Sequence, residues 1–302
     1  MANVMFRGLF PPFPTPLAAD GTLDEAALER LVCYQIDRGA SGLVALGGTG
    51  EATALTAATR KRVVEITVAV AAKRVPVIGG VLDPGYGGAL DTGRLYREAG
   101  ADGLMVIPAY YTRTDRDGVL RYFRALVPEL RLPVIYYDNP YRSHFVTPPA
   151  TIAQMEKEGL IVGMKASNTD LYHLDQLSKL VSDDFSLLSG QDTLFVQQVM
   201  LGAKGGVLTS ATLLPDYWAR VQSLAESGRA REALDAQGAL NPLMDALFDE
   251  QFPEGVRRAF AMLGLPIGES LPPVGRQSQA REERLRQAMD ALLDNGMLQP
   301  IG

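Results

Sequence analysis

A short pattern recurs along the chain, in which a glycine is followed at once by a run of apolar residues. Residues 38–46 read RGASGLVAL, residues 99–107 read AGADGLMVI, and residues 201–209 read LGAKGGVLT. Glycine is frequent just after the last helical residue, and an apolar run without polar alternation is typical of a strand buried on both faces. The pattern therefore predicts a chain that alternates helices with buried parallel strands.

Eight such apolar runs occupy the first two thirds of the chain. The predicted strands lie near residues 8–13, 42–46, 75–81, 103–107, 133–138, 160–165, 185–189 and 206–209. Amphipathic helical patterns cover residues 23–37, 56–73 and 118–130, the first with Asp20 or Thr22 near its start. Eight strands alternating with helices indicate a (β/α)8 TIM barrel. A doubly wound open sheet is the alternative, but it usually has fewer strands, and no G-x-G-x-x-G opens a helix here.

The strand pattern stops after about residue 215. The remainder is predicted to be helical at residues 217–227, 229–248, 254–263 and 282–295. We therefore expect a barrel domain over residues 1–225 that carries the catalytic site, and a C-terminal helical extension over residues 226–302.

Composition excludes several classes of function. The chain has 302 residues and a net charge of −6, which argues against a nucleic-acid partner. The single cysteine, Cys33, cannot form an intrachain disulfide, and His144 and His173 are too isolated to suggest a zinc site. No apolar stretch approaches the roughly 18 residues of a membrane span, and the start does not resemble a signal peptide. We expect a cytoplasmic protein without a metal or another cofactor.

Lys165 is the most informative candidate for catalysis. Of six lysines, it alone closes an apolar strand, at residues 160–164. Active sites of barrels lie at the C-terminal ends of the strands, and a lysine held inside a barrel has a lowered pKa. Its neutral amine could then form a Schiff base with a carbonyl. The alternative is a lysine whose stem is buried and whose ammonium reaches water.

Polar groups at neighbouring strand ends strengthen this hypothesis. Tyr136 and Tyr137 alternate across one strand, so only one can face the interior, where a phenol beside the lysine could move protons. Arg142 carries a planar fork that suits a carboxylate, although a surface ion pair would also explain it. The turn at residues 47–51, GGTGE, offers backbone N–H groups and the Thr49 hydroxyl to an anion, but as a lone motif it is weak. Together these groups suit a ketone beside a carboxylate, which is a 2-keto acid such as pyruvate.

Three segments, in this order and spacing, resemble the dihydrodipicolinate synthase/N-acetylneuraminate lyase family of pyruvate-dependent class I aldolases. They are Gly-Gly-Thr-Gly-Glu at 47–51, Tyr-Asp-Asn-Pro-Tyr-Arg at 137–142 and Gly-Met-Lys-Ala-Ser at 163–167. The resemblance runs from about Arg7 to at least Ser210. It implies a (β/α)8 barrel, a Schiff-base mechanism, and a homotetramer built as a dimer of dimers.

The resemblance also implies roles for single residues. Lys165 would form the Schiff base, Tyr137 would relay protons, and Tyr111 would reach across a subunit interface into a neighbour's site. Arg142 would meet the carboxylate of a second substrate, an aldehyde. The substrate-binding residues would be Thr49, Gly48, Gly50, Arg142, Gly190 and Leu208.

Departures from the family bear on the substrate and on regulation. Gly48 stands where the family has Thr or Ser, which removes a hydroxyl from the proton relay and leaves room for a bulkier partner. Asp138 replaces the usual Asn. The helix after Glu51 lacks the histidines of lysine-regulated members, and Asp83-Pro84-Gly85 replaces the Asn-containing segment of their allosteric site, so we expect no lysine feedback. A sugar-acid or aromatic 2-keto acid aldolase fits the wider site, and a 2-keto-3-deoxy sugar acid dehydratase or a non-catalytic 2-keto acid binder are alternatives.

Two further hypotheses concern the last two strands. A phosphate-binding barrel would use Gly190 and the Gly205-Gly206 pair. For the tail of the substrate, the candidate contacts are Gln191, Asp192, Thr209 and Ser210.

Overall fold

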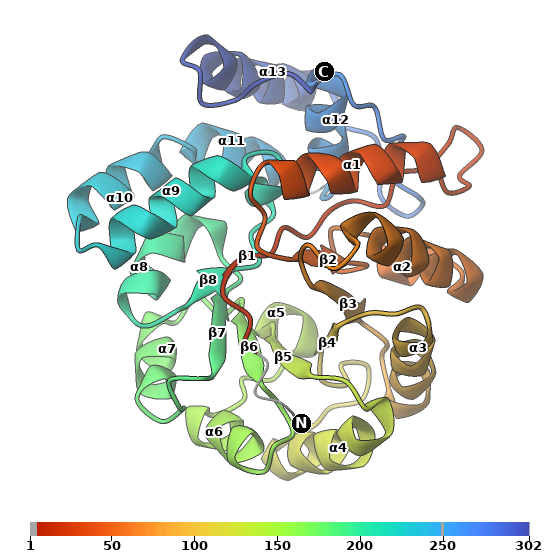
Figure 1. Ribbon diagram of the computed structural model, residues 1–302, viewed down its shortest axis with the longest axis vertical. Helices are drawn as coiled ribbons and strands as arrows, with labels where there is room; N and C mark the ends of the chain where they lie inside the picture. The colour runs from red at the N-terminus through yellow and green to blue at the C-terminus, as the bar shows by residue number, and fades with distance from the viewer. Residues whose placement is uncertain (1–4, 249–250, 302) are drawn as a thin grey trace.

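The computed structural model describes residues 5–248 and 251–301, and eight parallel strands form its centre (Figure 1). The strands are β1 (Gly8–Leu9), β2 (Leu43–Ala45), β3 (Val77–Val81), β4 (Gly103–Val106), β5 (Val134–Asp138), β6 (Gly163–Ala166), β7 (Ser186–Ser189) and β8 (Gly205–Gly206). Their hydrogen-bonded order is β1-β8-β7-β6-β5-β4-β3-β2. A parallel bridge between Pro12 and Val44 joins the two remaining edges. The predicted (β/α)8 barrel is confirmed.

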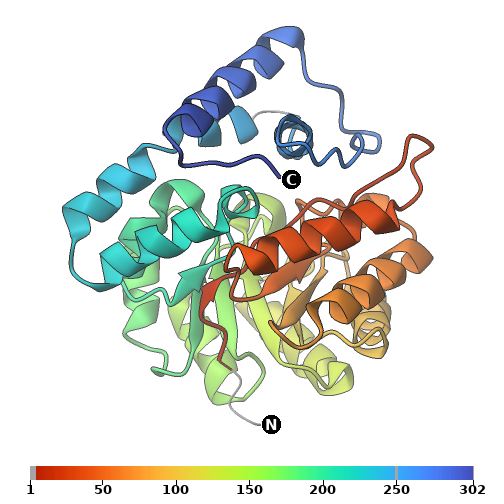
Figure 2. The same ribbon diagram turned by 45° about the horizontal axis from the view of Figure 1, so that its top comes forward.

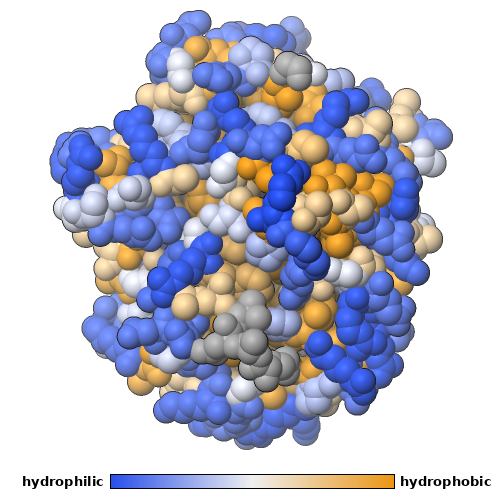
Figure 3. Space-filling model, in the orientation of Figure 1, coloured by the Kyte–Doolittle hydropathy of each residue, from blue (hydrophilic) through white to orange (hydrophobic). Residues whose placement is uncertain are grey.

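Helices surround the strands, and their apolar faces pack on the barrel. The helices are α1 (Glu25–Asp37), α2 (Ala57–Ala71), α3 (Tyr86–Glu98), α4 (Arg116–Leu130), α5 (Pro140–Ser143), α6 (Pro149–Lys157), α7 (Leu171–Ser178), α8 (Phe195–Met200), α9 (Pro215–Glu226), α10 (Ala230–Gly238), α11 (Asn241–Leu247), α12 (Glu254–Met262) and α13 (Gln279–Asp294). On the face seen in Figure 3, the rim that these helices form is mostly hydrophilic. This is the pattern expected when the apolar stripe of each helix is turned inward.

Local chemistry explains where several helices begin. Asp24, rather than the expected Asp20 or Thr22, is the N-cap of α1 and accepts a hydrogen bond from the Ala27 N–H. Thr56 caps α2 in the same way. Such side-chain caps satisfy N–H groups that have no partner inside the helix.

One helix prediction was wrong. The pattern over residues 229–248 predicts a single helix, but the structure has two, α10 and α11, separated at Ala239 and Leu240. Pro242 is the cause, because its ring would clash with the carbonyl of Gly238 in a continuous helix. The sequence analysis also missed α3, whose first turn contains Gly87 and Gly88.

The barrel has an inner and an outer apolar cluster. The inner cluster consists of Phe6, Phe10, Val44, Ile78, Met105, Ile107, Ile135, Tyr137, Leu188 and Val207. The larger cluster lies between the strands and the helices and continues into α9–α13. Figure 2 shows α12 and α13 above one end of the barrel. The C-terminal helices therefore close over the end of the barrel near α1.

Candidate active site

Tyr136 and Tyr137 point to opposite sides of β5, as their alternation predicts. Tyr136 faces outward, where its ring lies 5.3 Å from that of Phe123 and its hydroxyl hydrogen-bonds with that of Thr147 at 2.5 Å. Tyr137 belongs to the inner cluster and is 9 % exposed. The strand therefore places one phenol in the outer core and the other inside the barrel.

Lys165 lies on β6 directly beside Tyr137. The two residues are partners in the parallel register of β5 and β6, so both side chains point to the same face. Lys165 is 8 % exposed, and its Nζ lies 4.5 Å from the centroid of the Tyr137 ring. A sheltered amine and a phenol thus share one small volume at the C-terminal ends of the strands.

The Tyr137 hydroxyl is surrounded by groups that favour its ionised form. Burial raises the pKa of this phenol, but the Lys165 charge and hydrogen bonds from Asn139, Ser167 and Lys165 more than offset it, so the pKa lies below its usual range. The Asn139 amide donates to the hydroxyl at 3.0 Å. A phenol with a lowered pKa is better suited to give and take protons near neutral pH.

The turn after β2 faces the same volume. Thr49 is 4 % exposed, and its hydroxyl lies 3.4 Å from that of Thr209. Among the described residues, neither Thr49 nor Gly50 donates a backbone hydrogen bond to another group. These two N–H groups and the Thr49 hydroxyl are therefore available to an anion.

A buried ion pair fixes the turn from behind. Arg257 of α12 donates from Nε to the Glu51 carboxylate at 2.9 Å, and from Nη1 and Nη2 to the carbonyls of Ile267 and Thr15, each at 2.8 Å. The Leu271 N–H reaches the other Glu51 oxygen at 3.2 Å. Because every polar atom of the guanidinium is buried with a partner, the pair ties the C-terminal helices to the turn.

Asp192 supports the far side of the site. Its carboxylate accepts hydrogen bonds from the N–H groups of Thr209 and Ser210, at 3.2 and 2.7 Å, and from the Ser210 hydroxyl at 2.5 Å. Burial raises the pKa of Asp192, and these hydrogen bonds and the Lys165 charge oppose the rise. The hydrogen bonds of this carboxylate therefore fix the start of the segment that follows β8.

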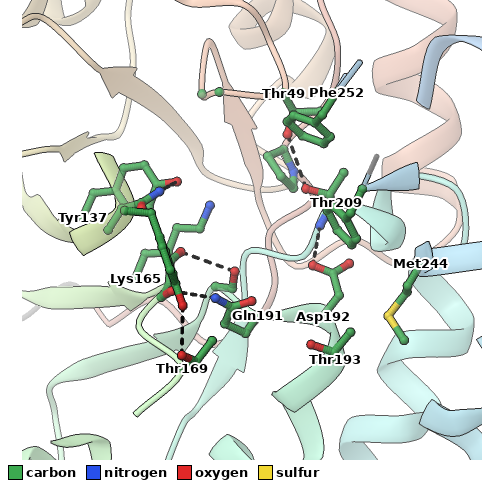
Figure 4. A pocket seen from close by; sticks show the side chains of 18 of the residues that line it. Thr49, Tyr137, Lys165, Thr169, Gln191, Asp192, Thr193, Thr209, Met244 and Phe252 are labelled. Carbon is green, nitrogen blue, oxygen red and sulfur yellow. Dashed lines mark hydrogen bonds between the residues drawn. The ribbon is translucent and has the colours of Figure 1, made fainter. Parts of the chain in front are cut away.

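These groups line one cavity of about 660 Å³ (Figure 4). From the strand ends the lining includes Pro12, Gly47, Gly48, Thr49, Tyr137, Asn139, Lys165, Ser167, Gly190, Gln191, Asp192, Thr193 and Thr209, and from farther out it includes Tyr141, Thr169, Met244, Asp245, Phe248 and Phe252. The volume is within the range of small-molecule sites in proteins.

The structure brings together five of the nine residues predicted for the site. Lys165, Tyr137, Thr49, Gly48 and Gly190 line the cavity. Of the four predicted contacts for the substrate tail, Gln191, Asp192 and Thr209 line it and Ser210 does not.

The other four predicted residues lie outside the lining. The Leu208 side chain is wholly buried in the outer cluster, and Gly50 is buried, with its carbonyl bonded to the Thr15 hydroxyl at 2.7 Å. Arg142 is exposed on α5, and Tyr111 is 89 % exposed. The roles predicted for these residues stay predictions.

Sequence reasoning missed the outer part of the cavity. It also missed Asn139 at the strand ends, although this residue belongs to the segment 137–142 and could have been found there. Met244, Phe248 and Phe252 follow the strands by about forty residues and carry no local signal, because only the packing of α11 against the barrel brings them there.

The phosphate hypothesis for the last two strands was wrong in one part. Gly205 and Gly206 form β8 itself and pair with Gly8 and Leu9 of β1. A Cβ on Gly205 would lie 2.0 Å from the Gly8 carbonyl oxygen, so this glycine is explained by close strand packing rather than by a phosphate loop.

Two features are absent from residues 5–248 and 251–301. No group of three or more His, Cys, Asp or Glu side chains gathers to hold a metal ion. None of the helices in these ranges combines the length and apolarity needed to cross a bilayer.

A closed barrel with a buried lysine and tyrosine at the C-terminal ends of its strands has the arrangement of a barrel enzyme. Comparison with known proteins narrows the class. The model of the dihydrodipicolinate synthetase family matches residues 5–292. The chain belongs to this family, as the sequence resemblance predicted.

Individual relatives agree over nearly the whole chain. The 4-hydroxy-tetrahydrodipicolinate synthase of Acidiphilium cryptum is 35 % identical over 288 residues, which cover 95 % of this chain and 99 % of that protein. The same enzyme of Syntrophus aciditrophicus is 34 % identical, covering 94 % and 98 %. These relatives confirm an enzyme of the aldolase type.

Solved structures of the family superpose closely. Dihydrodipicolinate synthase from Aquifex aeolicus has a TM-score of 0.91 at 29 % identity, covering 97 % of this chain and 99 % of that one. YagE, a prophage protein of this family from E. coli K12 solved in complex with pyruvate, has a TM-score of 0.89 at 25 % identity, covering 97 % and 100 %.

Proposed function

We propose that the chain is a class I aldolase in which Lys165 condenses with the keto carbon of pyruvate or a related 2-keto acid. The observation that carries the proposal is the placement of the Lys165 amine 4.5 Å from the Tyr137 ring, inside a cavity that also presents Thr49. An amine, a phenol and an anion-binding turn are the three groups that such a condensation needs. The pyruvate bound to the relative YagE supports the same donor.

Each group has a distinct part in the proposed reaction. Thr49 and the Gly50 N–H hold the carboxylate, which directs the keto carbon toward the Lys165 amine. Attack forms a carbinolamine, and Tyr137 protonates its hydroxyl so that water leaves and the imine remains. Loss of a proton from the adjacent methyl carbon gives an enamine, which is the nucleophile that adds to an aldehyde.

The dehydratase and the non-catalytic binder are not favoured, because the relatives above are named as synthases.

Reduction with borohydride tests the proposed chemistry directly. With pyruvate present, reduction should convert the imine to a stable secondary amine on Lys165, which intact-mass and peptide mass spectrometry detect. Lys165→Ala should show no adduct. The matched control Lys157→Ala, which removes an exposed lysine on α6, should be labelled like the original chain. A wild-type chain that takes up no pyruvate label would disprove the mechanism.

The proposal extends to assembly and location. We propose a homotetramer, a dimer of dimers, in which Tyr111 completes the site of a neighbouring subunit. The 89 % exposure of its large ring supports this, because such a ring gains from burial against another surface. A cytoplasmic location rests on the single, free cysteine. No cofactor is part of the proposed reaction.

A further inference from the structure

The outer part of the catalytic cavity has an apolar wall that comes from the C-terminal helices. Met244 of α11 is buried, and Phe248 and Phe252 follow that helix with their rings stacked at 5.8 Å between centroids and 26° between planes. All three line the cavity that contains Lys165. Figure 4 shows Met244 and Phe252 on the side of the cavity away from Tyr137. A molecule attacked by the enamine would therefore meet this wall with the part that points outward.

The charges around the cavity do not suit a second carboxylate. Lys165 is the only cationic side chain among the described lining residues, and in the proposed reaction its nitrogen is bonded to the first substrate. The remaining charged lining residues are acidic, Asp192 at the base and the exposed Asp245 at the mouth. Arg142, the residue expected to meet a second carboxylate, is exposed and outside the lining.

The cavity has room for an acceptor of substantial size beside the donor. A Cβ built on Gly48 would have no atom within 4 Å, so the turn leaves open space next to Thr49. The total volume of about 660 Å³ is far more than a three-carbon keto acid fills.

We propose that the acceptor is an uncharged aldehyde with an aromatic body, which packs against Phe248 and Phe252. This rests on the proposed function, since it needs the enamine on Lys165. The methyl-derived carbon of the enamine forms a bond to the aldehyde carbon, and the aldehyde oxygen takes up a proton to become a hydroxyl. Water then hydrolyses the imine, which releases a 4-hydroxy-2-keto acid and restores the Lys165 amine. Aromatic rings favour offset or edge contacts with one another, and these select an aromatic body over an aliphatic one.

Competition between acceptors tests the proposal. With saturating pyruvate, kcat/KM is measured for benzaldehyde, glyceraldehyde and aspartate semialdehyde by chromatography of the hydroxy-keto acids. We expect benzaldehyde to exceed aspartate semialdehyde by about 10-fold or more, the order of discrimination that an apolar pocket provides. Preference for aspartate semialdehyde or glyceraldehyde would overturn the aromatic acceptor. Borohydride trapping of pyruvate, run on the same preparation, shows separately whether the donor chemistry holds, and its failure would overturn both proposals.

Substitutions locate the effect at the wall. Phe252→Ala should lower kcat/KM for benzaldehyde by about 10-fold and leave the KM of pyruvate and the trapping yield unchanged. Phe252→Leu, which keeps an apolar side chain, should recover part of the loss. Tyr172→Ala, which removes an exposed ring on α7 that does not line the cavity, is the matched control and should change neither. Equal losses for all three aldehydes in Phe252→Ala would show a structural role and contradict the proposal.

Discussion

At the scale of single residues, the geometry of the site depends on two glycines, because neither has a side chain that would fill the space beside it. Gly190 and Gly48 both line the cavity, but they act differently. A Cβ on Gly190 would lie 2.2 Å from the Ser167 Oγ and 2.9 Å from the Lys165 Cε, whereas a Cβ on Gly48 would touch nothing. The first glycine lets the lysine take its position, and the second leaves space for substrate.

Gly190→Ala should therefore misplace Lys165. The added carbon forces the lysine stem or the Ser167 hydroxyl to move, and a displacement of about 1 Å at a reacting group costs on the order of 100-fold in rate. We expect kcat to fall by about that factor, with slower borohydride trapping, while the melting temperature changes little. Gly87→Ala, on the exposed face of α3, is the control and should retain full activity. Unchanged kcat in Gly190→Ala would show that the contact does not position the amine.

Asp138 is a second residue with a measurable consequence. It lies on β5 next to Tyr137, is 1 % exposed, and neither carboxylate oxygen has a hydrogen-bond partner among the described residues. Burial raises its pKa to about 6, and the nearby His173 charge opposes part of that rise. The folded state holds the proton of Asp138 more tightly than the unfolded chain does. The buried carboxylate therefore lowers the free energy of unfolding most at a pH above 6, where it is ionised in both states.

Asp138→Asn should accordingly stabilise the protein at neutral pH. A shift from 3.8 to about 6 corresponds to at most about 3 kcal/mol. The gain should be largest at pH 7.5, shrink as the pH falls from 6 toward 3.8, and vanish only below about pH 3, where Asp138 is protonated in both states. Thermal melting at these pH values checks it, with the exposed Asp183→Asn as the control. A gain that is the same at pH 4 and pH 7.5 would assign the effect to packing instead.

At the scale of elements, the notable connection joins the end of β2 to α12. Glu51 has a positive φ of 52° and is held there by Arg257, some 200 residues later in the chain. The turn at residues 47–51 also carries Thr49. The ion pair between Glu51 and Arg257 therefore connects the proposed anion site to the C-terminal helices. α12, which the predicted division at residue 225 assigns to the extension, thus contacts the turn that carries a proposed site residue.

Arg257→Lys should weaken binding of the 2-keto acid more than it slows the reaction. Lysine keeps the charge but loses the fork that reaches Thr15 and Ile267, so the turn loosens while Lys165 stays in place. We expect the KM for pyruvate to rise about 10-fold, with a smaller change in kcat, and a loss of about 2 kcal/mol in stability. Steady-state kinetics and thermal melting check both, with the exposed Arg284→Lys as the control. A fall in kcat with no change in KM would contradict this role.

At the scale of the whole molecule, the sequence predicted the barrel because each strand carries its own signal, a short apolar run, which follows a glycine in at least three of the eight cases. It also predicted Lys165 and Tyr137, because a charged or polar group at the end of a buried strand is conspicuous. The apolar wall of Phe248 and Phe252 could not be predicted, since an apolar residue after a helix fits an ordinary core equally well. Helix boundaries failed where a single proline, Pro242, outweighed the apolar periodicity.

The proposed assembly leads to a prediction about pairs of subunits. If Tyr111 completes the neighbour's site, Lys165→Ala and Tyr111→Phe chains should each be poorly active alone, because every site in either oligomer lacks one group. Co-refolded mixtures should regain activity, since a site with Lys165 from one chain can receive Tyr111 from the other. Light scattering of the unmixed chains should give the mass of a tetramer. If Tyr111 acted within its own chain, a mixture would regain nothing, because no single chain in it carries both groups. The complementation assay therefore separates a shared site from a self-contained one.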